Sequence, residues 1–177
     1  MKKQENSAHF KITAMKNKFR LLMIAFLAVS VASCVGIYED GSELAKANAD
    51  KVTQISVAEL NTILESEDAD YKLIDIREAN EYLLGNIPGS ANIPRGMLEF
   101  VINDEDYWMD NFYSYPPEKD TKIIIYCKSG MRGILAAVTL QKLGFTNVVN
   151  LEGGFMAFDP EFDESSATPQ SSGGCGG

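Results

Sequence analysis

The sequence predicts an α/β protein with a central parallel sheet and helices on both faces of that sheet. Three observations lead to this prediction. Apolar residues make up 45% of the 177-residue chain, which is typical of a globular domain. Strand-like and helix-like segments alternate between about residues 52 and 158, and capping or turn residues separate them. This alternation favours parallel strands, because a crossover between parallel strands usually contains a helix.

The first half of this region is expected to hold two helices and two strands. Ser56 and Glu59 match a capping box, so we expect a helix to begin there. Leu60, Ile63 and Leu64 give that helix one apolar face. The other expected elements are a strand at 71–76, a short helix at 78–84 that ends at Gly85, and a short strand at 91–93.

Residues 97–120 are acidic and aromatic, and we expect a helix followed by an irregular segment there. Their aromatic side chains, which include Trp108, Tyr113 and Tyr115, are expected to pack within the domain rather than to form a ligand platform. The elements expected after them are a strand at 122–126, a helix at about 131–143, a strand at 148–149, and a turn at 151–155 that leads into a last helical piece.

The first 33 residues differ in charge and pattern from the rest of the chain. They contain six Lys and Arg residues and one acidic residue, and small residues follow the apolar run at 21–29. Basic, apolar and small segments in this order are typical of a secretory signal, and the run is shorter than the ~20 residues of a membrane-spanning helix. A start at Met15 instead of Met1 would also leave a well-proportioned signal.

The segment Val31-Ala32-Ser33-Cys34 closely resembles the lipobox of bacterial lipoproteins. The resemblance implies that Cys34 is lipidated and becomes the mature N-terminus. The protein would then be anchored in the cell envelope, outside the cytoplasmic membrane, on the periplasmic side or at the surface. The alternative is an N-terminal membrane anchor that is not cleaved. The expected segments are a lipoprotein-type signal peptide at 1–33, a tether at 34–51, a domain at 52–160 and a flexible Ser/Gly tail at 161–177.

The charge of the remaining chain argues against one class of partner. The whole chain carries 16 Lys and Arg and 25 Asp and Glu residues, of which ten and 24 lie from residue 34 onward, a net charge of −14. Nucleic acid binding requires a basic surface, so nucleic acid is not an expected partner. The sequence predicts no particular oligomeric state.

Cys127 stands where the expected strand at 122–126 gives way to the expected helix at about 131–143. In a strand–loop–helix segment the loop N–H groups and the positive helix end form a cradle for an anion. That field favours the thiolate, and Lys128 and Arg132 add positive charge, so we expect a reactive cysteine rather than a buried structural thiol. The residues expected to bind the anion are Lys128, Ser129, Gly130, Met131, Arg132 and Gly133.

Two further segments resemble known signatures. The first runs LIDIREANEYLLGNIPGSANIP from Leu73 to Pro94, and the second runs LEGGFMAF from Leu151 to Phe158. With the CKSGMR loop between them, they closely resemble the rhodanese family of sulfurtransferases, in the order and spacing of one domain. Two positions differ from the family pattern: Asn86 replaces a usual histidine, and Ser90 replaces a frequent alanine.

The resemblance implies a rhodanese-type sulfurtransferase with Cys127 as the catalytic residue. Cys127 would take a sulfane sulfur from an anionic donor such as thiosulfate, become a persulfide, and pass the sulfur to a thiol or cyanide. The loop N–H groups would hold the persulfide, and neither a cofactor nor a metal is expected. Asp75, Arg77 and Glu81 are expected to form ion pairs or caps rather than to act as catalytic acids.

Two other functions remain open at this stage. One is a small-anion phosphatase or arsenate-reductase-like enzyme, although cysteine phosphatases have five residues between Cys and Arg and this loop has four. The only histidine, His9, lies within the expected signal, so no Cys–His pair is available to the mature protein. The other is a non-catalytic rhodanese-like module that binds a partner or senses redox state through Cys127.

The C-terminal tail contains the third cysteine, Cys175, among glycines and serines. A cysteine on a flexible tether could accept the persulfide sulfur from Cys127 or form a disulfide with it. The simpler interpretation, which we favour, is an exposed thiol without a role.

Overall fold

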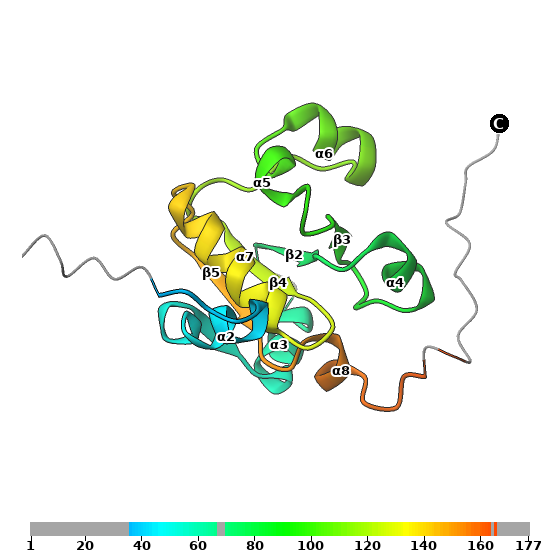
Figure 1. The fold of residues 1–177 in the computed structure, drawn as a ribbon. Helices are drawn as coiled ribbons and strands as arrows, with labels where there is room; N and C mark the ends of the chain where they lie inside the picture. Colours follow the sequence, from blue (N-terminus) through cyan, green and yellow to red (C-terminus); the bar gives the residue numbers. More distant parts are fainter. Residues whose placement is uncertain (1–35, 67–69, 164, 166–177) are drawn as a thin grey trace, which may run out of the picture. The chain divides into compact units, whose positions relative to one another are not determined.

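The computed structural model describes residues 36–66, 70–163 and 165 (Figure 1). Its strands are β1 (Thr53–Ile55), β2 (Tyr71–Asp75), β3 (Ala91–Asn92), β4 (Lys122–Tyr126) and β5 (Val148–Leu151). Its helices are α2 (Gly41–Lys46), η1 (Ala49–Lys51), α3 (Val57–Leu64), α4 (Ala79–Leu84), α5 (Leu98–Val101), α6 (Glu105–Phe112), α7 (Met131–Lys142) and α8 (Gly154–Phe158).

The strands form one parallel sheet in the order β1-β5-β4-β2-β3. Strand β4 lies at its centre, between β5 and β2, and Ile124 is level with both Leu73 and Val149. Helices connect successive strands, as parallel pairing requires. The carboxyl ends of the strands therefore share one edge, where ligands of such sheets commonly bind.

Alternating residues of β4 supply both halves of the core. Ile123 and Ile125 pack with residues of α2, α5, α6 and α7, whereas Ile124 and Tyr126 pack with residues of α3 and α8. Strands buried on both faces are expected in a parallel sheet covered by helices. The predicted α/β class, with helices on both faces, is confirmed.

The segment before β1 differs from the expected tether at 34–51. Residues 41–46 form helix α2, which Asp40 caps by accepting hydrogen bonds from the N–H groups of Ser42 and Glu43. The α2 residue Ala45 is fully buried, and α2 packs against α7. The tether prediction is wrong for this stretch, because one buried apolar residue and a good N-cap suffice to dock a short helix.

The acidic and aromatic region contains two helices, α5 and α6, where one was expected. Trp108 is buried, as expected, and its indole N–H donates to the Ile102 carbonyl. Tyr113 and Tyr115, however, are 89% and 66% exposed, so the packing prediction is wrong for these two.

Several predictions concern parts of the chain outside the described residues. These are the signal peptide at 1–33, the lipidation site Cys34 and Cys175 in the tail. Within the described residues, no helix has both the length and the apolar character that crossing a membrane would require.

A buried hydroxyl network joins the end of β4 to the turn before β3. The Tyr126 hydroxyl accepts a hydrogen bond from the Ile87 N–H at 3.1 Å and lies 2.8 Å from the Ser90 hydroxyl, which donates to the Ile87 carbonyl at 2.7 Å. Burial raises the Tyr126 pKa, so the hydroxyl stays protonated. Ser90, one of the departures from the family pattern, thus has a local structural role.

We predict that Tyr126→Phe lowers the free energy of unfolding by about 1–3 kcal/mol, because the buried Ile87 N–H loses its acceptor. Urea denaturation measures the change, and exposed Tyr115→Phe is the matched control. Equal unfolding free energies for the two variants would contradict the prediction.

Candidate active site

Cys127 follows the last residue of β4, at the carboxyl edge of the sheet. Cys127 is 1% exposed, and its sulfur accepts a hydrogen bond from the Gly130 N–H at 3.2 Å. The thiol is thus held at the base of the loop that begins α7.

The loop turns into α7 at Gly130, which has φ +86° and serves as the N-cap. This left-handed backbone favours glycine. No side chain caps this helix start within the described part of the chain, so the first N–H groups of the 12-residue helix remain available for an anion. The structure shows one N–H contact to the sulfur, from Gly130, and the full cradle of loop N–H groups stays a prediction.

Helix α8 holds the Cys127 loop in place through two backbone hydrogen bonds. The Phe155 N–H donates to the Cys127 carbonyl at 2.7 Å, and the Met156 N–H donates to the Lys128 carbonyl at 3.0 Å. A Cβ on Gly154 would lie 2.2 Å from the Cys127 carbonyl oxygen, so only glycine permits this approach. The contact explains physically why the second signature contains glycines.

Strand β5 contacts the start of α7 through the side chain of Asn150. The buried Asn150 side chain donates to Gln54, and its Oδ1 has no hydrogen-bond partner among the described residues. A Cβ on Gly133 would lie 1.9 Å from that oxygen. Gly133, predicted as a substrate-binding residue, thus also allows α7 to sit close to the sheet.

Arg132 forms an ion pair with Glu81, which was expected to take part in an ion pair or a cap but without a predicted partner. Its guanidinium lies 3.2 Å from the Glu81 carboxylate, which α4 supplies. Burial acts to lower the Arg132 pKa, but the Glu81 hydrogen bond and the nearby charges of Glu81 and Cys127 outweigh it and raise the pKa. Arg132, predicted to attract the substrate anion, is therefore paired with Glu81.

A second, buried ion pair lies beside the first. Asp75 is fully buried and accepts hydrogen bonds from the Arg77 N–H at 2.8 Å and from its guanidinium at 2.6 Å. Arg77 also donates to the Gly85 carbonyl at 2.7 Å and lies 4.2 Å from the Phe155 ring centre. Asp75 and Arg77 hold the turn after β2 in place, as expected, and so position Glu81.

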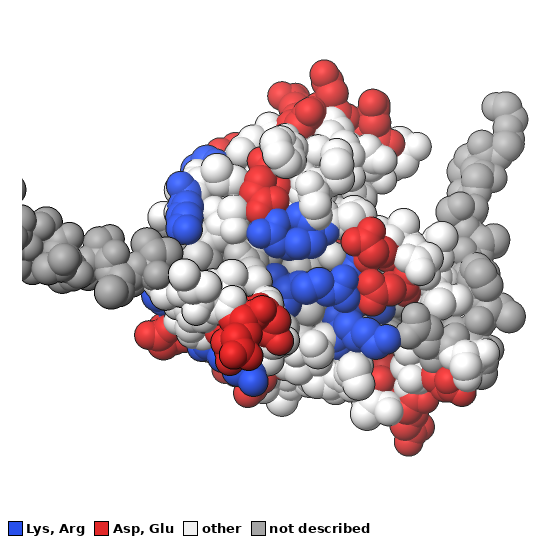
Figure 2. All heavy atoms as spheres, viewed as in Figure 1, with Lys and Arg blue, Asp and Glu red and all other residues white. Residues whose placement is uncertain are grey.

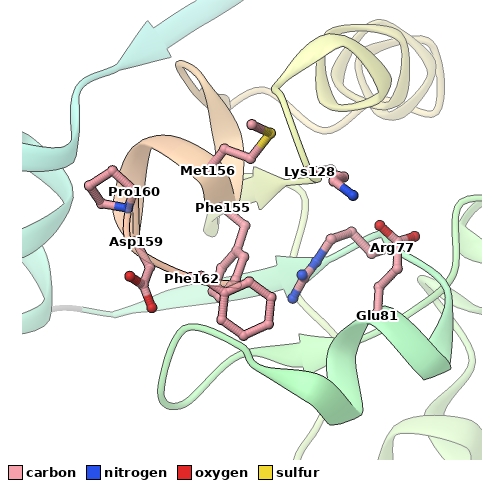
Figure 3. Close-up of a pocket in the computed structure, with 8 residues that line it drawn as sticks. All are labelled: Arg77, Glu81, Lys128, Phe155, Met156, Asp159, Pro160 and Phe162. Carbon is pink, nitrogen blue, oxygen red and sulfur yellow. The ribbon is translucent and has the colours of Figure 1, made fainter. Parts of the chain in front are cut away.

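A pocket of about 130 Å³ adjoins the loop (Figure 3). Figure 3 shows Glu81 and Lys128 on one side, Phe155, Phe162 and Asp159 on the other, and the Arg77 guanidinium reaching toward the rings. The full lining consists of Arg77, Glu81, Lys128, Phe155, Met156, Asp159, Pro160 and Phe162. Cys127 does not line it, but its neighbour Lys128 does.

Charges of both signs lie at the surface around the loop. Figure 2 shows basic side chains gathered over α7 and the loop before it, with acidic side chains directly beside them. The mixture agrees with the Arg132–Glu81 pair. The site therefore has positive charge close to the sulfur, within a chain whose net charge is −9.

The structure gathers the predicted site residues into this loop, with Ser129 exposed and Met131 half-buried. Asn86, at the position of the family histidine, donates to the Tyr82 carbonyl and thus has a local structural contact. The aromatic wall of the pocket was not predicted. Within the described residues, no group of three or more His, Cys, Asp or Glu side chains could hold a metal ion.

Residues 56–161 match the family model described as the Rhodanese-like domain. The chain belongs to this family, and its relatives include sulfurtransferases. The human protein named thiosulfate:glutathione sulfurtransferase is 33% identical over 103 residues, which are 57% of this chain and 88% of that protein.

Two solved structures share the fold. The human single-domain sulfurtransferase TSTD1 has a TM-score of 0.57 at 26% identity and covers 63% of this chain and 99% of its own. A Rhodopseudomonas palustris protein of unknown function, described as a possible tyrosine phosphatase, has a TM-score of 0.59 at 28% identity. The match covers 76% of this chain and 97% of that protein. The predicted rhodanese fold is confirmed.

We predict that Glu81→Gln reduces the dependence of stability on acid pH. The hydrogen bonds and charge of Arg132 outweigh the opposing effect of burial and lower the Glu81 pKa from 4.5. The ionised carboxylate therefore stabilises the fold above about pH 4.5, and that stabilisation is lost as the pH falls through the lowered pKa.

The measurement is urea denaturation of both proteins between about pH 6 and pH 3, where the difference in unfolding free energy should shrink as the pH falls. Glu118→Gln, at an exposed position, is the control. A difference that stays constant over this range would contradict the prediction.

Proposed function

We propose that the protein is a thiosulfate sulfurtransferase-like enzyme that moves a sulfane sulfur from an anionic donor to a thiol or cyanide through a Cys127 persulfide. The observation that carries this proposal is the contact between the Gly130 N–H and the Cys127 sulfur, 3.2 Å long, at the start of α7. An N–H group and a helix N-terminus at this position can stabilise the negative charge of a persulfide. The sulfurtransferase relatives support the same reaction class.

The first step loads the enzyme. The Cys127 thiolate attacks the outer, sulfane sulfur of thiosulfate, a new S–S bond forms, and the S–S bond of thiosulfate breaks. Sulfite leaves with the bonding electron pair, and Cys127 becomes a persulfide anion. The α7 N–H groups stabilise the negative charge on the outer sulfur, as hydrogen-bond donors do in an oxyanion hole.

The second step returns the enzyme to its starting state. Cyanide, or the thiolate form of a thiol, attacks the outer sulfur of the persulfide. The S–S bond to Cys127 breaks, its electron pair returns to Cys127 as the thiolate, and thiocyanate or a new persulfide leaves. No proton or oxidant is consumed.

The Arg132–Glu81 pair favours sulfur transfer over phosphate chemistry. A phosphatase arginine binds two phosphate oxygens side by side, but here the Arg132 guanidinium faces a carboxylate at 3.2 Å. A phosphate dianion would have to displace Glu81 or accept its repulsion, and thiosulfate meets the same repulsion in the loading step, but the persulfide intermediate that follows does not. A persulfide needs one binding position, which the loop N–H groups supply without the guanidinium.

We predict that Cys127→Ser abolishes both half-reactions. Wild-type protein incubated with thiosulfate should gain the mass of one sulfur atom and should release thiocyanate when cyanide is added. Cys127→Ser should do neither, because a serine hydroxyl is a far weaker nucleophile than a thiolate. Cys175→Ser is the matched control and should behave like wild type.

Other outcomes distinguish the alternatives. Hydrolysis of p-nitrophenyl phosphate that depends on Cys127, without thiocyanate formation, would replace this proposal with a phosphatase. A folded, reduced wild-type protein that accepts sulfur from neither thiosulfate nor an organic persulfide would favour a non-catalytic module.

We further propose that Cys34 carries a lipid that holds the protein in the cell envelope, outside the cytoplasmic membrane. The support is the lipobox-like segment and the basic, apolar and small pattern before it. The lipid would keep the sulfurtransferase domain beside the membrane, where small diffusing donors and thiols reach it.

We predict that Cys34→Ser moves the protein from the membrane fraction to the soluble fraction or leaves the signal uncleaved. Cell fractionation with mass spectrometry of the N-terminus separates these states. A wild-type protein that remains membrane-bound with residues 1–33 attached and Cys34 unmodified would instead support the uncleaved anchor.

A further inference from the structure

The wall of the pocket opposite its charged side includes Phe162, which lies one residue beyond the family match at 56–161. The chain after α8 turns back so that this side chain reaches the pocket (Figure 3). The wall therefore combines Phe155 and Met156, which lie within the family match, with Phe162, which lies just beyond it.

Two contacts hold the Phe162 ring in place. Its centre lies 5.1 Å from that of Phe155, with the planes at 77°, an edge-to-face arrangement. The ring also covers Gly85, where a Cβ would lie 2.6 Å from the ring edge. Phe162 is half-buried, so part of its ring remains available to a molecule in the pocket.

The pocket combines two kinds of surface. Phe155, Phe162 and Met156 form an apolar side, and the charged lining consists of Lys128, the carboxylates of Glu81 and Asp159, and Arg77, which is paired with Asp75 and lies against the Phe155 ring. A volume of about 130 Å³ is that of roughly four water molecules, so a small organic group fits it. Cyanide and thiosulfate have no apolar part that could use the wall.

We propose that Phe162 determines acceptor specificity by favouring thiols with an apolar or aromatic stem over cyanide. The stem packs against Phe155 and Phe162, and the thiolate points toward the loop, beside Lys128. That thiolate attacks the outer persulfide sulfur, the bond to Cys127 breaks, and an organic persulfide leaves. The inference rests on the proposed sulfurtransferase function.

The experiment compares two acceptors, benzyl thiol and cyanide, with thiosulfate as donor and the full chain as enzyme. The variants are Phe162→Ala, Phe162→Leu and the control Phe158→Ala. Phe158 also contacts Phe155, at 6.4 Å between ring centres, but it is absent from the pocket lining. Because both acceptors attack the same persulfide, the ratio of their kcat/KM values does not depend on the fraction of folded enzyme.

Phe162→Ala should lower kcat/KM for benzyl thiol about five- to tenfold, which corresponds to a lost aromatic contact, and should change the cyanide value less than about twofold. Phe162→Leu should lose less, and Phe158→Ala should keep the wild-type ratio. Equal losses for both acceptors in Phe162→Ala would leave the ratio unchanged. That result would overturn this inference but not the proposed function. Failure of the wild type to form thiocyanate would overturn the proposed function and this inference with it.

Discussion

The hydrogen bonds from the start of α8 to the carbonyls of Cys127 and Lys128 are the constraint on which the site depends. They hold the carbonyl oxygens toward α8, and in the same loop the Gly130 N–H donates to the sulfur. Two helix N-termini thus meet at one loop: α8 binds its carbonyls, and α7 continues from it. The close approach at Gly154 makes this possible, because any side chain there would collide with the loop.

The charge of the site is arranged in pairs rather than left as a simple basic patch. The Asp75–Arg77 pair is buried and fixes the turn before α4, and Glu81 on α4 forms an ion pair with Arg132. The backbone N–H groups at the start of α7 add to the charges of Lys128 and Arg132 in the loop, and they carry no side-chain entropy.

Much of the fold and the central part of the site could be predicted from the sequence. Strand β4, the Cys127 loop and α7 are adjacent in the chain, so local pattern alone places them together. The Arg132–Glu81 pair joins residues 51 positions apart, and only the sheet order brings α4 beside α7. Phe162 was assigned to a tail by its Ser- and Gly-rich neighbours, because composition does not show that one aromatic ring folds back. Helix α2 was missed for a similar reason, since a single buried Ala45 anchors it.

The position of β1 in the sheet has a consequence for how the domain folds. Strand β1 is paired with β5, and the Gln54–Asn150 side-chain contact across this pair spans 96 positions of the chain. A growing polypeptide therefore cannot complete the sheet until nearly all of the family domain has been made, and contacts of such long range slow folding. The same delay leaves the chain unfolded for longer than a domain built from local contacts. It also means that a nascent chain stopped before β5 would expose the apolar strands β2 and β4, which chaperones or proteases would meet first.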